Sequence, residues 1–188
     1  FSIATMGFRG EALPSIASVS KFTLVSRTRE THTGTCVEIA GGRLINVTDT
    51  GAPVGTMVEV KALFYNTPAR KKFLKSDQTE ISHIADAVAG MALAHPDIQF
   101  KLVANGRTVR HYPASPDLLQ RTISVLGSDT ANRLYPVRFE EPGLKLCGYC
   151  ANPMLFRSTS SRIFLFVNRR MIHDRGLYDR YCEGMQVL

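Results

Sequence analysis

The stretch TMGFRGEALPS, residues 5–15, places two glycines three positions apart and then changes to a helical pattern. Gly7 and Gly10 flank a Phe–Arg pair, and the residues after Gly10 favour a helix. Glycine backbone followed by a helix start offers free N–H groups to an anion, and the arginine adds a charged fork beside them. The pattern is typical of a phosphate site. It also fits an ordinary loop-to-helix junction in which glycine only permits the turn.

The composition is that of a globular protein with a basic surface. The chain has 188 residues, of which 44% are hydrophobic and 21% charged, and its net charge is +7. This excess favours anionic partners such as nucleic acid, nucleotide or acidic membrane. No apolar run approaches the roughly 18–20 residues of a membrane helix, and no signal region opens the chain. Because the sequence starts at Phe1 and stops at Leu188 without a capped element, we interpret it as a piece of a longer polypeptide.

The cysteines and histidines do not predict a metal or redox site. Cys147 and Cys150 form a C-x-x-C pair inside a predicted strand, which would direct their side chains to opposite faces. We therefore expect buried free thiols, and a reducing, cytoplasm-like compartment. The five histidines lack metal-ligand spacing, and no Ser/His/Asp arrangement is visible. The sequence thus predicts no metal ligands and no catalytic residues within the chain.

Periodicity and turn signals predict strands mixed with helices, which indicates an α+β fold. A basic helix is expected to begin at Pro68, and a longer helix over 77–94 has an apolar stripe expected to be core. That stripe consists of Ile81, Ile84, Val88 and Met91. The predicted strands cover residues 21–28, 34–40, 43–49 and 56–63, with a helix over 10–18 before them, carrying Ile16 and Val19 on its apolar side.

The second half repeats this mixture of hairpins and helices. Asn105 and Gly106 are a strong hairpin signal, and the stretch PASPD, residues 113–117, is the best linker candidate. Ser115 is expected to cap a helix that runs to about Leu126. Strands are predicted at 135–140, 144–151 and 163–168, and the residues from 169 onward are expected to turn into a last helix.

Three segments resemble the MutL family of DNA mismatch-repair proteins. Residues 7–13, GFRGEAL, resemble the family signature. Residues 55–75, GTMVEVKALFYNTPARKKFLK, resemble its G-T…L-F-Y-N-T-P-A-R block, and residues 164–175, FLFVNRRMIHDR, resemble its V-N-x-R segment. The segments occur in family order and span about residues 1–184. Together they are far more specific than the glycine pattern alone.

The resemblance implies an ATPase fold shared with type II topoisomerases, a class of heat-shock chaperones and histidine kinases. That fold is an α/β sandwich with a mobile lid over the phosphates. Residues 1–113 would be the C-terminal part of the ATP-binding domain, and residues 117–188 the N-terminal part of a transducer-like α+β domain with a left-handed βαβ crossover. The implied ATP-binding residues are Gly7, Phe8, Arg9, Gly10 and Thr56.

The motifs that this family uses for hydrolysis are not found in the chain. The general-base glutamate, the magnesium-binding asparagine and the D-x-G-x-G segment would lie upstream of Phe1, and a phosphate-sensing lysine beyond Leu188. The intact protein is therefore expected to be an ATPase that uses ATP and Mg²⁺. The 188-residue chain alone is expected neither to hydrolyse ATP nor to bind it tightly.

Basic residues gather in two places, on the helix expected to begin at Pro68 and in the turn around residues 169–175. Arg169, Arg170 and Arg175 crowd one turn, where they would contact DNA phosphates or form a solvated basic face. Arg70 is expected to tie down its own loop. The run Asn66, Thr67 and Pro68 resembles a helix-start device.

The resemblance implies an ATP-dependent dimerising clamp that links mismatch recognition to downstream repair. Its partners would be DNA, a second MutL-type subunit (a homodimer) and a mismatch-recognition protein. The protein would be cytoplasmic and associated with DNA, without membrane contact. The alternatives are a non-catalytic basic DNA-binding scaffold with a vestigial lid motif, or another member of the ATPase group such as a topoisomerase subunit.

Overall fold

The computed structural model describes residues 10–152, 163–174, 176 and 179 of the chain. The chain divides into two compact units, Phe1–Ser76 and Asp77–Leu188. The predicted linker at residues 113–117 lies inside the second unit, so the domain boundary proposed at that position remains a prediction. The mixture of helices and strands is the predicted α+β class.

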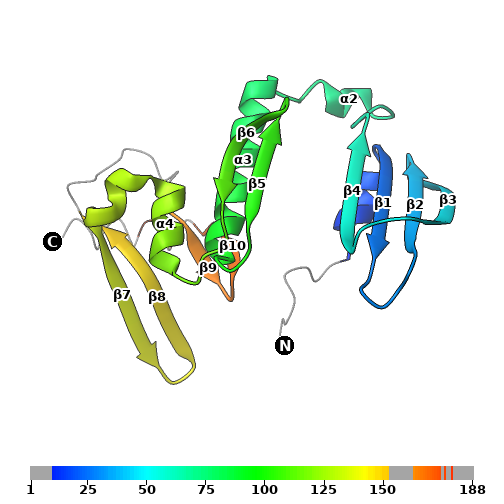
Figure 1. Cartoon of the computed structure of the whole chain (residues 1–188). Helices are drawn as coiled ribbons and strands as arrows, with labels where there is room; N and C mark the ends of the chain where they lie inside the picture. Colours follow the sequence, from blue (N-terminus) through cyan, green and yellow to red (C-terminus); the bar gives the residue numbers. More distant parts are fainter. Residues whose placement is uncertain (1–9, 153–162, 175, 177–178, 180–188) are drawn as a thin grey trace. The chain divides into compact units, whose positions relative to one another are not determined.

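The first unit is built on a four-stranded antiparallel sheet in the order β3-β2-β1-β4 (Figure 1). Gly41 and Gly42 join β2 to β3 with φ angles of 57° and 83°, as a two-residue hairpin of type I′ requires. The predicted hairpin is therefore confirmed. The elements of this unit are α1 (Ala12–Ala17), β1 (Lys21–Arg27), β2 (Gly34–Ala40), β3 (Arg43–Thr50), β4 (Gly55–Lys61) and α2 (Pro68–Lys71).

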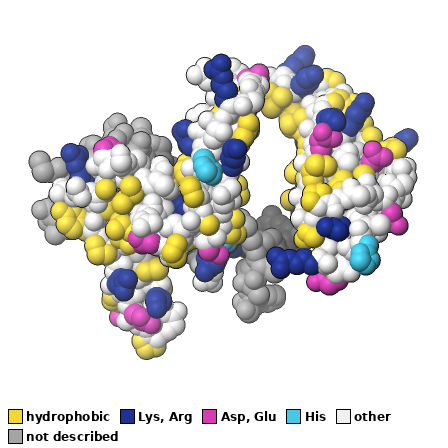
Figure 2. All heavy atoms as spheres, in the orientation of Figure 1, with side chains coloured by type: hydrophobic (Ala, Val, Ile, Leu, Met, Phe, Trp, Pro, Cys, Tyr) yellow, Lys and Arg dark blue, Asp and Glu magenta, His cyan; other side chains and the backbone are white. Residues whose placement is uncertain are grey.

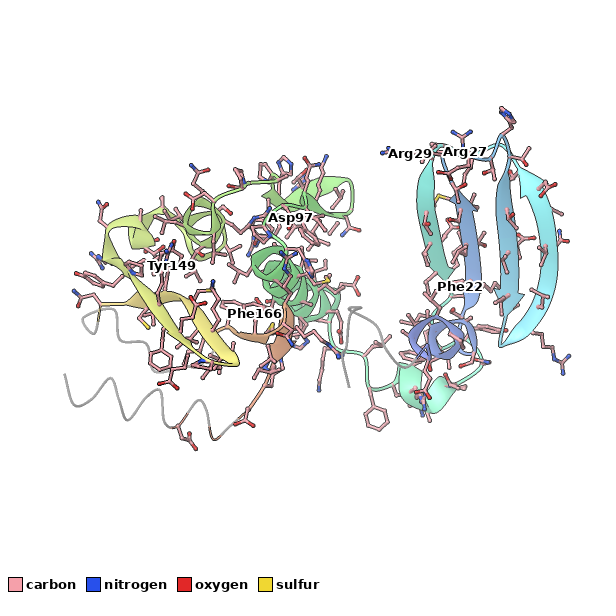
Figure 3. All side chains as sticks on the ribbon, turned by 90° about the horizontal axis from the view of Figure 1, so that it is seen from below. Phe22, Arg27, Arg29, Asp97, Tyr149 and Phe166 are labelled. Atoms are coloured by element: carbon pink, nitrogen blue, oxygen red, sulfur yellow. The ribbon has the colours of Figure 1, made fainter. Side chains whose placement is uncertain are left out.

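The register of the four strands gathers apolar side chains on one face of the sheet. Directly opposed residues share a face, so Phe22 and Val60 lie on the same side, as do Leu24 and Val58. Phe22 is buried and lies next to α1 (Figure 3), whereas Val58 and Val60 are 45% and 41% exposed. Val37, Ile39, Val47 and Leu44 continue the same face on β2 and β3. The residues of this apolar face are exposed on the outer strands β3 and β4, and buried or half-buried on β1 and β2.

Strand β4 ends earlier than predicted, and α1 buries different residues. The strand stops at Lys61 because Ala62 takes a φ of 51°, which is not extended backbone. The apolar side of the first helix was predicted to contain Ile16 and Val19. Val19 is buried, but Ile16 is 37% exposed, and the buried residue of α1 itself is Ala17.

The second unit is organised around the 18-residue helix α3 (Asp77–Ala94), whose length was predicted correctly. Its predicted apolar core stripe was correct only in part: Val88 packs against the core and Ile81 is half-buried, but Ile84 and Met91 are 48% and 37% exposed. Small side chains are buried instead, since they let the helix approach its neighbours closely. The core consists of Ala89, Ala92 and Tyr112, surrounded by Val88, Phe100 and Val125.

Among its described residues, the second unit has three antiparallel hairpins. Asn105 and Gly106 turn the first one with φ angles of 50° and 74°, so the predicted Asn-Gly hairpin is confirmed. Charged side chains of both signs gather near the tip of the second (Figure 2), where Lys145 pairs with Glu140 at 3.6 Å. The hairpins are β5 (Phe100–Ala104) with β6 (Arg107–Tyr112), β7 (Leu134–Glu141) with β8 (Leu144–Ala151), and β9 (Leu165–Val167) with β10 (Arg170–Ile172).

Strand β10 corrects the sequence analysis, which placed a turn into a helix from residue 169 onward. Asn168 and Arg169 form a two-residue turn with φ angles of 49° and 63°, and the chain then pairs back onto β9. Positive φ at both positions is typical of type I′ hairpins. Because this turn contains no glycine, its sequence did not indicate a hairpin.

Helix α4 (Leu118–Leu126) begins at a different cap from the one predicted. The N-cap is Asp117, whose Oδ1 accepts a hydrogen bond from the backbone N–H of Leu119 at 2.9 Å. Ser115 supports the same turn because its Oγ accepts from the N–H of Asp117 at 3.2 Å. The 3₁₀ helix η1 (Ser128–Arg133) follows α4.

Arg121 of α4 is 1% exposed and bonds to two separate backbone segments, the α3–β5 loop and the residue after β6. Its Nη2 donates to the carbonyl oxygens of Pro96 at 2.7 Å, Ile98 at 2.8 Å and Pro113 at 2.8 Å. Burial lowers the pKa of this guanidinium, while the charges of Tyr112 and Asp97 act to raise it. The arginine therefore holds α4 to the α3–β5 loop and to the residue that follows β6.

The register of β8 places Cys147 and Cys150 on opposite faces, as predicted. Both are free thiols, but Cys147 is exposed, which contradicts its predicted burial. Cys182 lies outside the described residues. No helix in the described part of the chain is long and apolar enough to cross a membrane.

Candidate functional site

Of the candidate lid residues, the structure describes Gly10. Gly7, Phe8 and Arg9 lie outside the described residues. Gly10 is exposed and has a φ of 67°, and a Cβ added there would meet no atom within 4 Å. Backbone conformation, not space, therefore favours glycine at this position. Helix α1 begins two residues later, and its N-cap Glu11 makes no side-chain capping bond.

Thr56 lies at the end of the apolar sheet face, next to other hydroxyl groups. The register pairs Ser26 with Thr56 on one side and with Thr35 on the other, so the three side chains cross three strands on one face. The Oγ of Ser26 and the Oγ1 of Thr56 are 2.8 Å apart and share a hydrogen bond. Asp49 opposes Thr35 and extends the row to β3. We name these four residues the polar row.

The polar row and the apolar face together suit a ligand with an apolar ring and polar edges. Hydroxyl groups can donate one and accept two hydrogen bonds, so they can follow the donors and acceptors of a ring system. The valines beside Thr56, Val58 and Val60, supply exposed apolar surface on the same strand. Pockets for small molecules combine these two features: an apolar lining and a few placed polar groups.

Two of the three predicted DNA-contacting arginines lie on the β9–β10 hairpin. Arg169 occupies the turn and is exposed, whereas Arg170 opens β10 and is half-buried. Arg175 lies outside the described residues. Met171 of β10 approaches α3 closely, since a Cβ added to Gly90 would lie 2.5 Å from its Sδ. The hairpin that presents Arg169 is thus packed against α3.

The expected helix start at Thr67 and Pro68 is confirmed, since Pro68 is the first residue of α2, but the expected roles of Asn66 and Arg70 were wrong. Thr67 is the N-cap of α2 but makes no side-chain capping bond. Asn66 points elsewhere, because its Nδ2 donates to the carbonyl oxygen of Ser18 at 2.9 Å. Arg70 is exposed, and the hydrogen bonds that fix its loop come from Asn66 and from the backbone of Phe64.

Comparison with known proteins connects this geometry to a family. A family model described as "DNA mismatch repair protein, C-terminal domain" matches residues 122–183. MutL of Acidobacterium capsulatum is 39% identical over 97% of the chain, and MutL of Opitutus terrae is 45% identical over 93%. The Aquifex aeolicus MutL ATPase domain complexed with ADP is 32% identical, with a TM-score of 0.76. That match covers 92% of this chain and 67% of the domain. The chain belongs to the MutL family of DNA mismatch-repair proteins.

The match locates the chain within the ATPase part of MutL proteins. A second crystal structure of the ATPase domain of Aquifex aeolicus MutL, described as a bacterial mismatch repair endonuclease, is 26% identical over 95% of this chain with a TM-score of 0.70. The chain spans only 31% and 28% of the lengths of the two bacterial MutL relatives. The α+β fold is therefore that of the MutL ATPase domain, seen over part of the MutL sequence.

The described part of this MutL chain contains no cluster of three or more typical metal ligands. No group of three or more His, Cys, Asp or Glu side chains lies together among residues 10–152 and 163–174. Mg²⁺ is held mainly by carboxylates, phosphates and water. No chemical step is assigned to that ion.

Two structural features of the site escaped the sequence analysis. Ser26 was not singled out, since only the strand register shows that it opposes Thr56. Asn66 was assigned to α2, but its partner Ser18 lies 48 positions away in the sequence. The alternating pattern of β1 could have indicated Ser26, whereas no local signal indicates the Asn66 contact.

Proposed function

We propose that this chain supplies the lid end and the sheet of the ATP-binding region of a MutL-type mismatch-repair protein. The observation that carries the proposal is the similarity, over 92% of the chain, to a MutL ATPase domain complexed with ADP. The polar row beside a partly exposed apolar face agrees with a nucleotide at this sheet. Residues 1–113 would belong to the ATP-binding domain and residues 117–188 to the transducer-like domain.

In this proposal Gly7, Phe8, Arg9 and Gly10 cover the phosphates. Gly10 has the backbone freedom to let the segment before α1 change direction. Backbone N–H groups of the lid would donate to phosphate oxygens, and the guanidinium of Arg9 would add charge-assisted bonds. Thr56 would contact the nucleotide from the sheet, with its hydroxyl oriented by Ser26. Ordering of such a segment by phosphate contacts is a common switch.

The ordered lid would exclude water and favour pairing with a second MutL-type subunit. ATP hydrolysis by the intact protein, with Mg²⁺ held by groups beyond the described residues, would then release the clamp. The exposed Arg169, together with Arg170 and Arg175, would contact DNA phosphates and so act without regard to sequence. A mismatch-recognition protein would be the partner upstream in the repair reaction.

Calorimetric titration with a non-hydrolysable ATP analogue and magnesium tests the proposal. We expect the full-length protein to bind the analogue and the 188-residue chain alone to show no detectable binding. A full-length protein that binds DNA but no nucleotide would overturn the proposal and favour the DNA-binding scaffold. Micromolar binding by the isolated chain would show that the nucleotide pocket is complete within these residues, contrary to the assignment made here.

A further inference from the structure

The loop that follows β4 holds two non-glycine residues in the left-handed region. Ala62 has a φ of 51° and Phe64 a φ of 61°. L-residues rarely adopt this conformation, because it places Cβ too close to the backbone. Such residues persist only where the surrounding structure imposes them, and they gather at functional positions. The cause of this backbone geometry should therefore be visible in the contacts of the loop.

Those contacts reach the C-terminal end of α1. The backbone N–H of Phe64 donates to the carbonyl oxygen of Val19 at 2.7 Å, and Nδ2 of Asn66 donates to that of Ser18 at 2.9 Å. The loop is closed internally by the N–H of Tyr65, which donates to the carbonyl of Ala62 at 3.0 Å. The positive φ values thus allow the N–H of Phe64 and the side-chain amide of Asn66 to bind the neighbouring carbonyls of Val19 and Ser18.

The β2–β3 turn binds the same segment. The N–H of Gly42 donates to the carbonyl of Ala17 at 3.1 Å, and the N–H of Gly41 donates to that of Ser20 at 3.0 Å. Four successive carbonyls, from residue 17 to residue 20, are therefore each bound by one of two loops. The last carbonyls of a helix have no partner within the helix, so these bonds satisfy groups that would otherwise need water. We name residues 41–42 and 62–67 together the clasp.

The two ends of α1 are held very differently. At the C-terminal end Ala17, Val19 and Ser20 are buried, and the clasp binds their carbonyls. At the N-terminal end Gly10 is exposed, has open space around its Cα and precedes a helix without a side-chain cap.

We propose that the clasp is a positioning device for the nucleotide lid, and that Asn66 is its positioning residue. The proposal rests on the proposed function, because it assigns the segment before Gly10 to the lid. A helix fixed at one end removes conformational freedom that nucleotide binding would otherwise have to remove, and this raises affinity. The clasp proposal also explains the L-F-Y-N part of the second motif, residues 63–66, which would hold α1 in place.

The test compares variants of the full-length protein by calorimetric titration with a non-hydrolysable ATP analogue. Asn66→Ala removes one donor to the end of α1, and Asn66→Asp places a carboxylate against a carbonyl. Asn46→Ala, an exposed asparagine on β3, is the matched control. We expect both Asn66 variants to bind the analogue about five-fold more weakly, as for the loss of one hydrogen bond, and the control to bind normally.

Hydrogen exchange separates positioning from a general loss of folding. In Asn66→Ala the amides of Gly42 and Phe64, which donate to α1, should exchange faster, while the amides of β1 and β2 that pair with each other should not change. Gly41→Ala perturbs the clasp from the other loop, since its Cβ would lie 2.7 Å from Oη of Tyr65, and should weaken binding in the same direction.

The outcomes distinguish the two proposals. Wild-type protein that binds no analogue overturns the proposed function, and the positioning role of Asn66 with it. Wild-type protein that binds, together with Asn66 variants that bind equally well, overturns the clasp proposal alone. Weaker binding with unchanged exchange at Gly42 and Phe64 would also overturn it, since the effect would then not act through α1.

Discussion

Replacement of Arg121 by methionine tests whether one buried guanidinium holds α4 to two backbone segments. Methionine keeps much of the apolar stem but removes all three bonds to Pro96, Ile98 and Pro113. A hydrogen bond to a charged group contributes about 1.5–3 kcal/mol, and a single nitrogen shared among three acceptors gives less than the sum. Buried carbonyls left without a donor cost about 1–3 kcal/mol, and we expect Arg121→Met to lower the free energy of unfolding by about 2–3 kcal/mol.

Urea unfolding followed by circular dichroism provides the measurement. With a slope of about 1–3 kcal/mol per molar urea, the variant should lower the midpoint by roughly 1–3 M without a change in slope. Arg121→Lys keeps a charge but loses the fork geometry, so it should lie between methionine and wild type. Arg110→Met on β6 is the control. That arginine is exposed and donates only to the carbonyl of Val109, so its replacement should cost less than about 0.5 kcal/mol.

The reasoning would be refuted by an Arg121→Met protein within 1 kcal/mol of wild type. Such a result would mean that the three carbonyls find other partners at little cost. A midpoint shift accompanied by a smaller slope would also contradict it, because the denatured state or the cooperativity would then have changed instead of the native bonds.

Three further predictions follow from single contacts. Arg169→Ala should weaken DNA binding several-fold and reduce the slope of log K against log salt concentration by about 1. Arg138→Ala on β7 is the control and should change neither the affinity nor the slope. An unchanged salt slope in Arg169→Ala would show that Arg169 does not contact DNA. Ser26→Ala should lower analogue affinity a few-fold because the Thr56 hydroxyl loses its partner at 2.8 Å, and equal affinity in titration would contradict this role. Ala62→Gly relieves a φ of 51° and should raise the melting temperature by about 1–3 °C, whereas a lower melting temperature would show that the loop is not strained.

Local signals predicted those parts of the fold that depend on neighbouring residues. The turns at Gly41–Gly42 and Asn105–Gly106 combine residues that tolerate positive φ with alternating flanks, and both hairpins formed as expected. Asn168 and Arg169 adopt the same backbone geometry without glycine, so β10 could not be anticipated.

Volume and long-range contacts explain the remaining differences. The apolar stripe of α3 was chosen by hydrophobicity, yet the helix buries small residues such as Ala92 because its neighbours approach closely. The contact between Asn66, in the second family motif, and Ser18, at the end of α1, joins residues that lie 48 positions apart, and no local pattern contains that information. For the candidate site, the resemblance supplied the residues, while the strand register and the hydrogen bonds showed which of them lie together.

Hydrogen exchange of the full-length protein, with and without a non-hydrolysable ATP analogue and magnesium, tests the central claim most directly. We predict that the analogue slows exchange of the amides in residues 7–10 and at the Thr56 end of β4, while β7 and β8 are unaffected. Tight binding of the analogue without protection of these two segments would place the nucleotide elsewhere in the protein. It would contradict the assignment of the lid and the sheet to this chain.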